Sequence, residues 1–292
     1  MKKLHFTSDL GSEYNKQPFV PSKDIVNSSN FSMFEATYNS LDRGFKSKKE
    51  CEKEREEFKN FIKNELKNKR KTLIGVFAQA RQQSMMAFLY ECFKDDESFN
   101  YPIYVDGVLG NSMNSVYLSI LEDEEKQYWL DVMNWKNFHY ISSYERSMSV
   151  ALNKEEVRIV LSSSGMFQAG RVVNHLKTMV EKDNCTIVLC GYQGEGTIGN
   201  SLQNPLIKEV KIEGMSYRKR CKIYQMHTWS SHIQAEENIK YMSQIKTPLI
   251  VLNHSDEDNK YEFRDIVEEE LRQRNNSAKI VCASETENIW FI

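Results

Sequence analysis

Two acids and two histidines in this sequence stand at the end of a predicted strand or just before a predicted helix, and together they could bind a metal ion or transfer a proton. His232 precedes a predicted helix, and His254 directly follows the apolar run 248–253. Asp9 and Glu35 each end a short apolar stretch near the N-terminus. Imidazole and carboxylate groups are common metal ligands and acid–base groups. For each residue taken alone, a hydrogen-bonded histidine or a turn-forming acid is the simpler interpretation.

Two loops rich in serine and glycine could bind an anion. Ser163, Ser164 and Gly165 follow an apolar run, and the pattern G-x-G-x-x-G occupies 194–199 after another. Glycines let backbone N–H groups approach a phosphate closely, and a helix N-terminus attracts negative charge. An ordinary capped helix start explains the first loop equally well. A nicotinamide-binding unit is disfavoured for the second, because Pro205 cuts short the long helix that it requires.

The elements that would position these residues alternate between strand and helix. Predicted strands cover 72–77, 102–105, 157–162 and 185–190, and predicted helices cover 81–93, 113–121 and 171–181. This alternation is typical of an α/β fold with a parallel sheet and helices on both faces. The charged stretch 46–71 carries apolar residues at helical spacing, which predicts an amphipathic helix with a solvated charged face.

The flanking segments follow a different pattern. Short strands are predicted at 4–7 and 31–38, separated by a polar loop. After residue 199, two consecutive strands, 207–213 and 218–226, follow without a helix between them. A helix, strand, helix and strand are then predicted at 233–245, 248–253, 261–274 and 279–282. The change in pattern predicts a domain boundary near residue 205.

Composition excludes several classes of protein. The 292 residues are 40% hydrophobic and 27% charged, with 39 Lys and Arg against 41 Asp and Glu for a net charge of −2. These values argue against disorder, collagen and coiled coil, and against a protein that coats nucleic acid by bulk charge. No apolar run is long enough for a membrane span or a signal peptide. Six cysteines without a C-x-x-C pair predict reduced thiols in a cytoplasmic protein.

Taken in chain order, the motifs resemble those of the β-CASP ribonucleases of metallo-β-lactamase fold. The matching segments are F-T-S-D-L-G at 6–11, E-A-T-Y at 35–38, V-F-A-Q-A-R-Q-Q at 76–83, P-I-Y-V-D-G at 102–107, S-S-G-M at 163–166, G-Y-Q-G-E-G-T at 191–197, S-S-H at 230–232 and N-H-S-D at 253–256. The sequence departs from the family at four places. Gly75 replaces a proline, Ala80 a glycine, 233–234 an Ala-Asp pair and 255–256 a Gly-Glu pair.

The resemblance implies a domain layout and a set of roles. It implies a tail of a first metallo-β-lactamase segment at 1–45, a β-CASP domain at 46–205 and a returning metallo-β-lactamase segment at 206–292. Asp9 would bridge two metal ions and His254 would bind one of them. His232 would protonate the leaving oxygen, with Glu35 orienting it. The residues expected to hold RNA phosphates are Ser163, Ser164, Gly165, Gln193, Gly194, Gly196 and Thr197.

The resemblance also implies an incomplete metal site. The family places an H-x-H-x-D-H motif and a further histidine ligand before the counterpart of Asp9, and none of the six histidines here belongs to such a motif. The sequence is therefore expected to correspond to the C-terminal part of such a nuclease. Two divalent ions, zinc or manganese, would need more ligands than Asp9 and His254 provide. We expect weak metal binding and little nuclease activity from the isolated chain.

The function implied is metal-dependent hydrolysis of RNA phosphodiesters in RNA processing, incomplete in this single chain. The expected partners are single-stranded RNA and a separate chain that carries the H-x-H-x-D-H half, with a homodimer left open and no membrane partner. Two alternatives stay open: a non-catalytic RNA-binding or scaffolding paralogue, and a truncated inactive fragment.

Overall fold

The computed structural model describes residues 2–14, 28–37, 47–230 and 232–284, and they form two compact units. Of the described residues, unit 1 combines 2–14, 28–37, 47–52, 230 and 232–284, and unit 2 consists of 53–229. Within the described residues, no helix is long and apolar enough to span a membrane.

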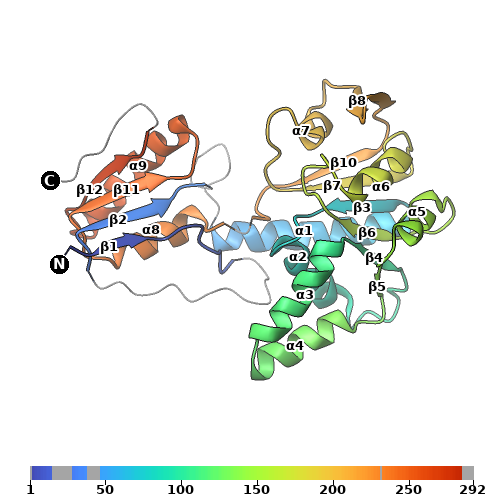
Figure 1. The fold of residues 1–292 in the computed structure, drawn as a ribbon, viewed down its shortest axis with the longest axis horizontal. Coiled ribbons are helices and arrows are strands. Elements are labelled where there is room, and N and C mark those ends of the chain that lie inside the picture. The colour runs from blue at the N-terminus through green and yellow to red at the C-terminus, as the bar shows by residue number, and fades with distance from the viewer. Residues whose placement is uncertain (1, 15–27, 38–46, 231, 285–292) are drawn as a thin grey trace. The chain divides into compact units, whose positions relative to one another are not determined.

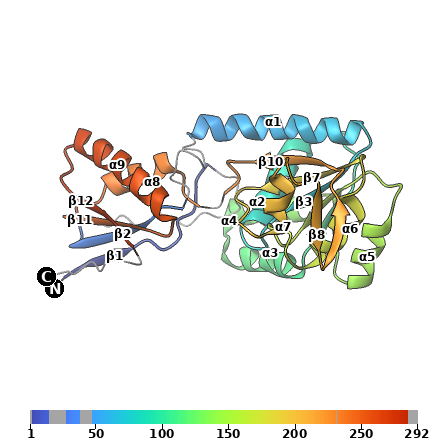
Figure 2. The same cartoon turned by 90° about the horizontal axis from the view of Figure 1, so that it is seen from above.

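Unit 1 is built on a four-stranded sheet in the order β1-β2-β11-β12. Its strands are β1 (Leu4–Phe6), β2 (Phe31–Glu35), β11 (Leu249–Asn253) and β12 (Lys279–Cys282), and all neighbouring pairs are parallel. The helices α8 (Ala235–Ser243) and α9 (Glu257–Gln273) lie on one side of this sheet, as Figure 2 shows. Alternate strand residues, Phe34, Ile250, Leu252 and Ile280 among them, form a core with these helices.

Unit 2 is built on a six-stranded sheet in the order β10-β7-β3-β6-β4-β5 (Figure 1). Its strands are β3 (Lys71–Gly75), β4 (Ile103–Asp106), β5 (Phe138–Tyr140), β6 (Ile159–Ser162), β7 (Cys185–Cys190) and β10 (Lys222–Met226), again all parallel. A separate antiparallel hairpin joins β8 (Glu209–Ile212) to β9 (Met215–Arg218).

Helices cover both faces of the six-stranded sheet, which confirms the predicted fold class. The helices of unit 2 are α1 (Lys48–Lys67), α2 (Arg81–Phe93), α3 (Val108–Ile120), α4 (Asp123–Met133), α5 (Tyr144–Leu152), α6 (Arg171–Met179) and α7 (Ile198–Gln203). One core joins the sheet to α1, α2 and α4 through residues such as Phe58, Leu89 and Trp129. The second core joins the opposite face to α5 and α6 through residues such as Val150 and Leu176.

The structure corrects the sequence prediction around residues 205–229. The predicted strand 218–226 contains β10, whereas β9 lies almost wholly before it and was not predicted, because the chain first turns back in the β8–β9 hairpin. β10 pairs with β7 in parallel, so the chain stays in unit 2 as far as Trp229. The boundary predicted near residue 205 therefore lies inside unit 2. The elements α4, β5, α5 and α7 were not predicted, and Tyr38 of the E-A-T-Y motif lies outside the described residues.

Two departures from the family motif have a structural explanation in unit 2. A Cβ on Gly75 would overlap the ring of the buried Phe167, so the end of β3 requires glycine here. Ala80, which replaces the family's glycine, has a φ of 61°. With its ψ of −51°, this is the positive-φ conformation of a γ-turn, which is costly for a residue with a side chain. The turn into α2 therefore keeps the backbone shape that the glycine would favour.

Candidate metal centre

Three parallel strands of unit 1 end beside one another and bring the predicted chemistry to one edge of the sheet. β1, β2 and β11 are consecutive neighbours, so their carboxyl ends share that edge. Asp9 follows β1, Glu35 is the last residue of β2, and His254 follows β11. Ligands of open parallel sheets bind outside this edge. The fold therefore places three of the four predicted residues by strand order alone.

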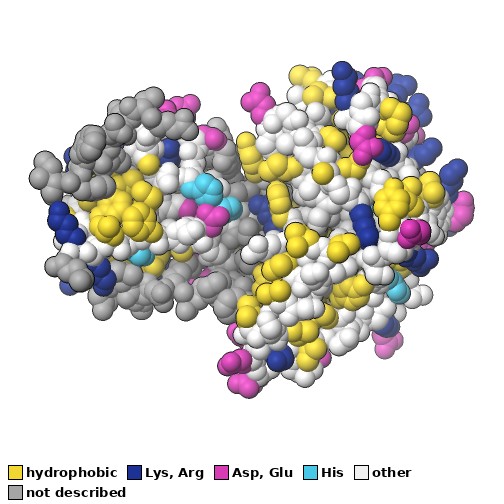
Figure 3. All heavy atoms as spheres, viewed as in Figure 1, with side chains coloured by type: hydrophobic (Ala, Val, Ile, Leu, Met, Phe, Trp, Pro, Cys, Tyr) yellow, Lys and Arg dark blue, Asp and Glu magenta, His cyan; other side chains and the backbone are white. Residues whose placement is uncertain are grey.

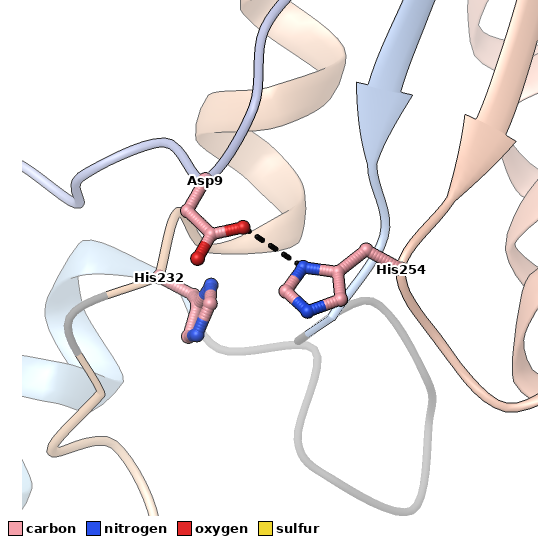
Figure 4. Close-up of side chains that lie close together, drawn as sticks. All are labelled: Asp9, His232 and His254. Atoms are coloured by element: carbon pink, nitrogen blue, oxygen red, sulfur yellow. Dashed lines mark ion pairs between the residues drawn. The ribbon is translucent and has the colours of Figure 1, made fainter.

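Asp9, His232 and His254 form a cluster that could hold a metal ion. One potential ligand atom from each residue lies within 4.8 Å of the others. The Nδ1 atom of His254 is 2.9 Å from Oδ1 of Asp9. Figure 4 shows the three side chains pointing toward a common space, from the segment after β1, the segment before α8 and the end of β11. His232 was predicted as the proton donor, and the geometry also brings it within reach of a metal held by the other two.

Glu35 supports the cluster from beneath. Its carboxylate is buried, and Oε2 is 2.9 Å from Nδ1 of His232. The other oxygen, Oε1, accepts a hydrogen bond from the Leu10 amide at 2.6 Å. Asn238 donates to the Glu35 carbonyl at 2.8 Å. A carboxylate at Nδ1 fixes the ring orientation and directs Nε2 toward a metal or a substrate.

The backbone is strained on both sides of the cluster. Ser8 and His254 have φ values of 51° and 57°, in the left-handed region that non-glycine residues rarely adopt. The hydroxyl of Thr37 donates to the His254 carbonyl at 3.0 Å, which helps to hold this turn. Residues in such conformations cluster at functional sites, where the surrounding structure enforces them.

The cluster is open to solvent on one side. The side chains of Asp9 and His254 are 63% and 56% exposed, whereas that of His232 is 20% exposed. A hollow of about 520 Å³ lies against it, lined by Phe6, Thr7, Ser8, Asp9, Met33, Phe34, Glu35, Asn253 and His254. Figure 3 shows histidine and acidic side chains together on this surface of unit 1, beside a hydrophobic patch. A substrate group could therefore reach the acid and the histidines directly.

The two predicted phosphate-binding loops lie together in unit 2. They follow β6 and β7, the two strands that flank β3. Gln193 donates from Nε2 to the Gly165 carbonyl at 3.2 Å, and the Gly199 amide donates to the Met166 carbonyl at 3.0 Å. The Ile198 amide donates to Oε1 of Gln168 at 2.8 Å. The contact between the loops is therefore made by direct hydrogen bonds.

These internal hydrogen bonds limit which backbone groups could hold a phosphate. The amide of Ser164 donates to Ala169, and that of Thr197 donates to Gly194. Among the described residues, no backbone acceptor is found for the amides of 163, 165 and 193–196. Amides of both loops could therefore hold an anion, and the second loop contains Gly196 with a φ of 76°.

Two histidines of unit 2, His175 and His139, lie outside the metal cluster. His175 is fully buried, and its Nε2 is 2.7 Å from the carboxylate of Asp106. Arg171 and Ser147 also donate to this carboxylate. Burial opposes ionisation of Asp106, but the hydrogen bonds from these three side chains outweigh it, and the pKa of Asp106 lies below its ordinary value. His139 is exposed on β5.

Sequence reasoning missed the residues that hold the cluster in place. Ser12 and Glu237 bond to one another at 2.6 Å, although they lie in distant parts of the chain. Thr37 and Asn238 contact the backbone at His254 and Glu35. The one available signal was the spacing of Gln234 and Glu237, three residues apart at the start of a helix, which is typical of a cap.

Comparison with protein families confirms the predicted resemblance. Residues 82–202 match the Beta-Casp domain, and residues 216–278 match the Zn-dependent metallo-hydrolase RNA specificity domain. The first match lies in unit 2, and the second runs from the β8–β9 hairpin to the region before β12.

Several similar proteins carry names that refer to RNA cleavage or transcription termination. The chain is 26% identical to the transcription termination factor FttA of Methanococcus maripaludis over 73% of this chain and 34% of that protein. It is 30% identical to an RNase J-like protein of Methanocaldococcus jannaschii over 61% of this chain and 41% of that protein. It is 24% identical to the endoribonuclease YSH1 of Saccharomyces cerevisiae over 64% of this chain and 25% of that protein. The chain spans about a third of the length of the first of these relatives.

Proposed function

Because the chain belongs to the β-CASP family of metallo-β-lactamase-fold proteins, we propose that it forms part of a metal-dependent nuclease that hydrolyses RNA phosphodiesters during RNA processing. One observation carries the proposal: Asp9, His232 and His254 converge at the carboxyl edge of the unit 1 sheet, with Glu35 beneath them. Residues distant in sequence rarely bring a carboxylate and two imidazoles to one open surface without a chemical role.

The donor set fits a divalent transition metal. One carboxylate and two imidazoles are ligands that zinc and manganese both accept. Asp9 and His254 would hold the ion, which would supply an activated water and stabilise charge on the phosphoryl oxygens. Asp9 and His254 supply two ligands, so one ion with an open position needs a third ligand and a second ion needs more. These ligands would come from a polypeptide carrying the H-x-H-x-D-H motif, and a homodimer is the other assembly to test.

His232 and Glu35 would act on the leaving group. Glu35 accepts the hydrogen bond at Nδ1, so the ring would pass a proton through Nε2 to the departing oxygen. Unit 2 would hold the single-stranded RNA through backbone amides of the 163–165 and 193–197 loops.

The test separates metal binding from proton transfer. The chain, alone and co-expressed with the coding sequence directly upstream, would be titrated with Mn²⁺ and Zn²⁺ by calorimetry and assayed for cleavage of single-stranded RNA. We expect D9N and H254A to weaken metal binding and abolish cleavage. We expect H232A to retain metal binding and lower the cleavage rate at saturating RNA by about 10²–10⁴-fold, the usual contribution of a general acid. H139A, an exposed histidine of unit 2, is the matched control.

Two outcomes would contradict the proposal. Cleavage that survives D9N would exclude a role for this cluster. RNA binding that is independent of metal and unaccompanied by cleavage would instead support the non-catalytic RNA-binding paralogue.

A further inference from the structure

The segment that carries Asp9 is held in place by side chains from other parts of unit 1. β1 ends at Phe6, and Asp9 lies in the segment that follows it. The side chain of Asp9 is largely exposed. Residues 10–13 then run beside the start of α8. The Ile233 amide donates to the Leu10 carbonyl at 2.8 Å, and Gly11 forms an antiparallel bridge with His232. Asp9 and His232 are therefore neighbours because this strap, residues 10–13, lies against the approach to α8.

Glu237 fixes the strap with one buried carboxylate. Ser12 donates its hydroxyl to Oε2 at 2.6 Å, and the Glu13 amide donates to Oε1 at 2.7 Å. Ser12 is fully buried and Glu237 is 7% exposed. Hydrogen bonds to an ionised carboxylate are shorter and stronger than neutral ones, and burial strengthens them further.

The same carboxylate also binds the segment that carries His232. Oε2 of Glu237 is 3.2 Å from the amide of Gln234, at the start of α8. One side chain therefore contacts the strap after Asp9 and the helix start after His232. Glu35 makes a comparable link, since it accepts hydrogen bonds from Leu10 and His232. The relative position of Asp9 and His232 depends on these two acids, and only Glu35 touches the cluster itself.

We propose that Glu237, with Ser12 as its partner, is a positioning residue that holds the segment carrying Asp9 in place and so tunes the metal affinity of the cluster. The inference rests on the proposed metal-binding role of Asp9. Helix capping alone does not account for the contacts, because two of the three donors to Glu237 belong to the strap and not to α8.

The first experiment measures metal affinity in the full chain. S12A removes one hydrogen bond to Glu237 and leaves α8 intact, and E237Q removes the charge while keeping the shape. We expect both to weaken Mn²⁺ and Zn²⁺ binding by about tenfold, the usual effect of removing a partner of a metal ligand. S12T keeps the hydroxyl and should restore the affinity. K240G weakens α8 at an exposed position, so it should lower the melting temperature without changing the affinity.

The second experiment needs no metal. Hydrogen exchange of the metal-free chain should be about tenfold faster at residues 10–13 in S12A and E237Q, and unchanged there in K240G. Unchanged exchange at 10–13 in both strap variants would overturn the inference, whatever the metal result. Faster exchange with wild-type metal affinity would overturn it too. If the wild-type chain binds no metal while exchange responds as expected, the proposed metal site fails and the strap stands.

Discussion

Glu35 forms hydrogen bonds to three separate parts of the candidate metal centre. It ends a buried strand, so its carboxylate lies under the sheet edge instead of in solvent. From there it accepts hydrogen bonds from His232 and Leu10, one from each side of the cluster. A buried acid in this position costs free energy unless it is fully hydrogen-bonded, and here both oxygens have donors.

The change E35Q tests that arrangement. An amide keeps the size of the side chain but loses the charged acceptor that orients the His232 ring. We expect cleavage to fall by about 10- to 100-fold, the usual loss for a partner of a ligand or acid, with a smaller change in melting temperature. Cleavage rate and thermal melting would be measured together. E268Q, an exposed acid on α9, is the control, and wild-type cleavage by E35Q would contradict the role.

Ala80 gives a prediction about stability. Its φ of 61°, with a ψ of −51°, is less favourable for alanine than for glycine, so A80G should stabilise the chain by about 1 kcal/mol. The matched change A87G, inside α2, should destabilise it by about the same amount, because glycine weakens a helix interior. Urea unfolding of both variants measures the difference. A loss of stability in A80G would show that the side chain contributes packing that outweighs the strain.

Side-chain partners distant in sequence were the part of the site that could not be predicted. The motif positions of Asp9, Glu35, His232 and His254 followed from strand ends and the family resemblance. The bond between Ser12 and Glu237 did not, because nothing in a local pattern pairs a serine with an acid from another part of the chain. Such contacts depend on the tertiary fold, which the sequence pattern describes only as a class.

At the scale of elements, the sequence predicted the strands and helices whose apolar residues form a clear local pattern. The strand 185–190 is a continuous apolar run, and the helix 81–93 is long and buried, and both match the structure to the residue. The helix α4 was missed although its acidic first turn is typical of a helix start, because its buried side is narrow and consists of Trp129 and Val132. β10 was predicted as a strand. Its parallel pairing with β7 was not predicted, because the pairing depends on tertiary contacts and not on the local sequence.

Asp106, which links β4 to α5 and α6, predicts that the stability of the chain depends on pH. Asp106 ends β4 and accepts hydrogen bonds from α5 and α6 through Ser147, Arg171 and His175. Burial raises the pKa of Asp106, but the hydrogen bonds lower it by more than burial raises it. The folded-state pKa therefore lies below the unfolded value of about 3.9. The stabilisation is therefore complete above that unfolded value and is lost as the pH falls through the folded-state pKa.

The change D106N makes this testable. At pH 7 it should cost about 3 kcal/mol, because it removes a buried charge from its partners. Below about pH 4 the wild type loses stability more steeply, so the difference between the two proteins should shrink. Urea midpoints from pH 7 to pH 3 would measure it, with D131N, an exposed acid on α4, as control. A difference that stays constant over this range would contradict the assignment.

At the scale of the whole molecule, two units with separate cores divide the proposed chemistry. The core of unit 1 is built from its own sheet, α8 and α9, and both cores of unit 2 are built from residues of unit 2. The candidate metal residues all belong to unit 1, and the loops proposed to hold RNA all belong to unit 2. Binding in one unit should therefore stabilise that unit by mass action and leave the other unchanged.

Hydrogen exchange with and without metal tests this independence. At a free metal concentration 100 times the dissociation constant, binding stabilises a site by about 2.7 kcal/mol, which slows exchange through unfolding about 100-fold. We expect that slowing in the unit 1 core, at Leu252 for example, and none at Val188 in unit 2. H254A should remove the effect. Slowing of equal size in both cores would show that the chain unfolds as one cooperative body, and the division of metal and RNA binding between two independent units would then be wrong.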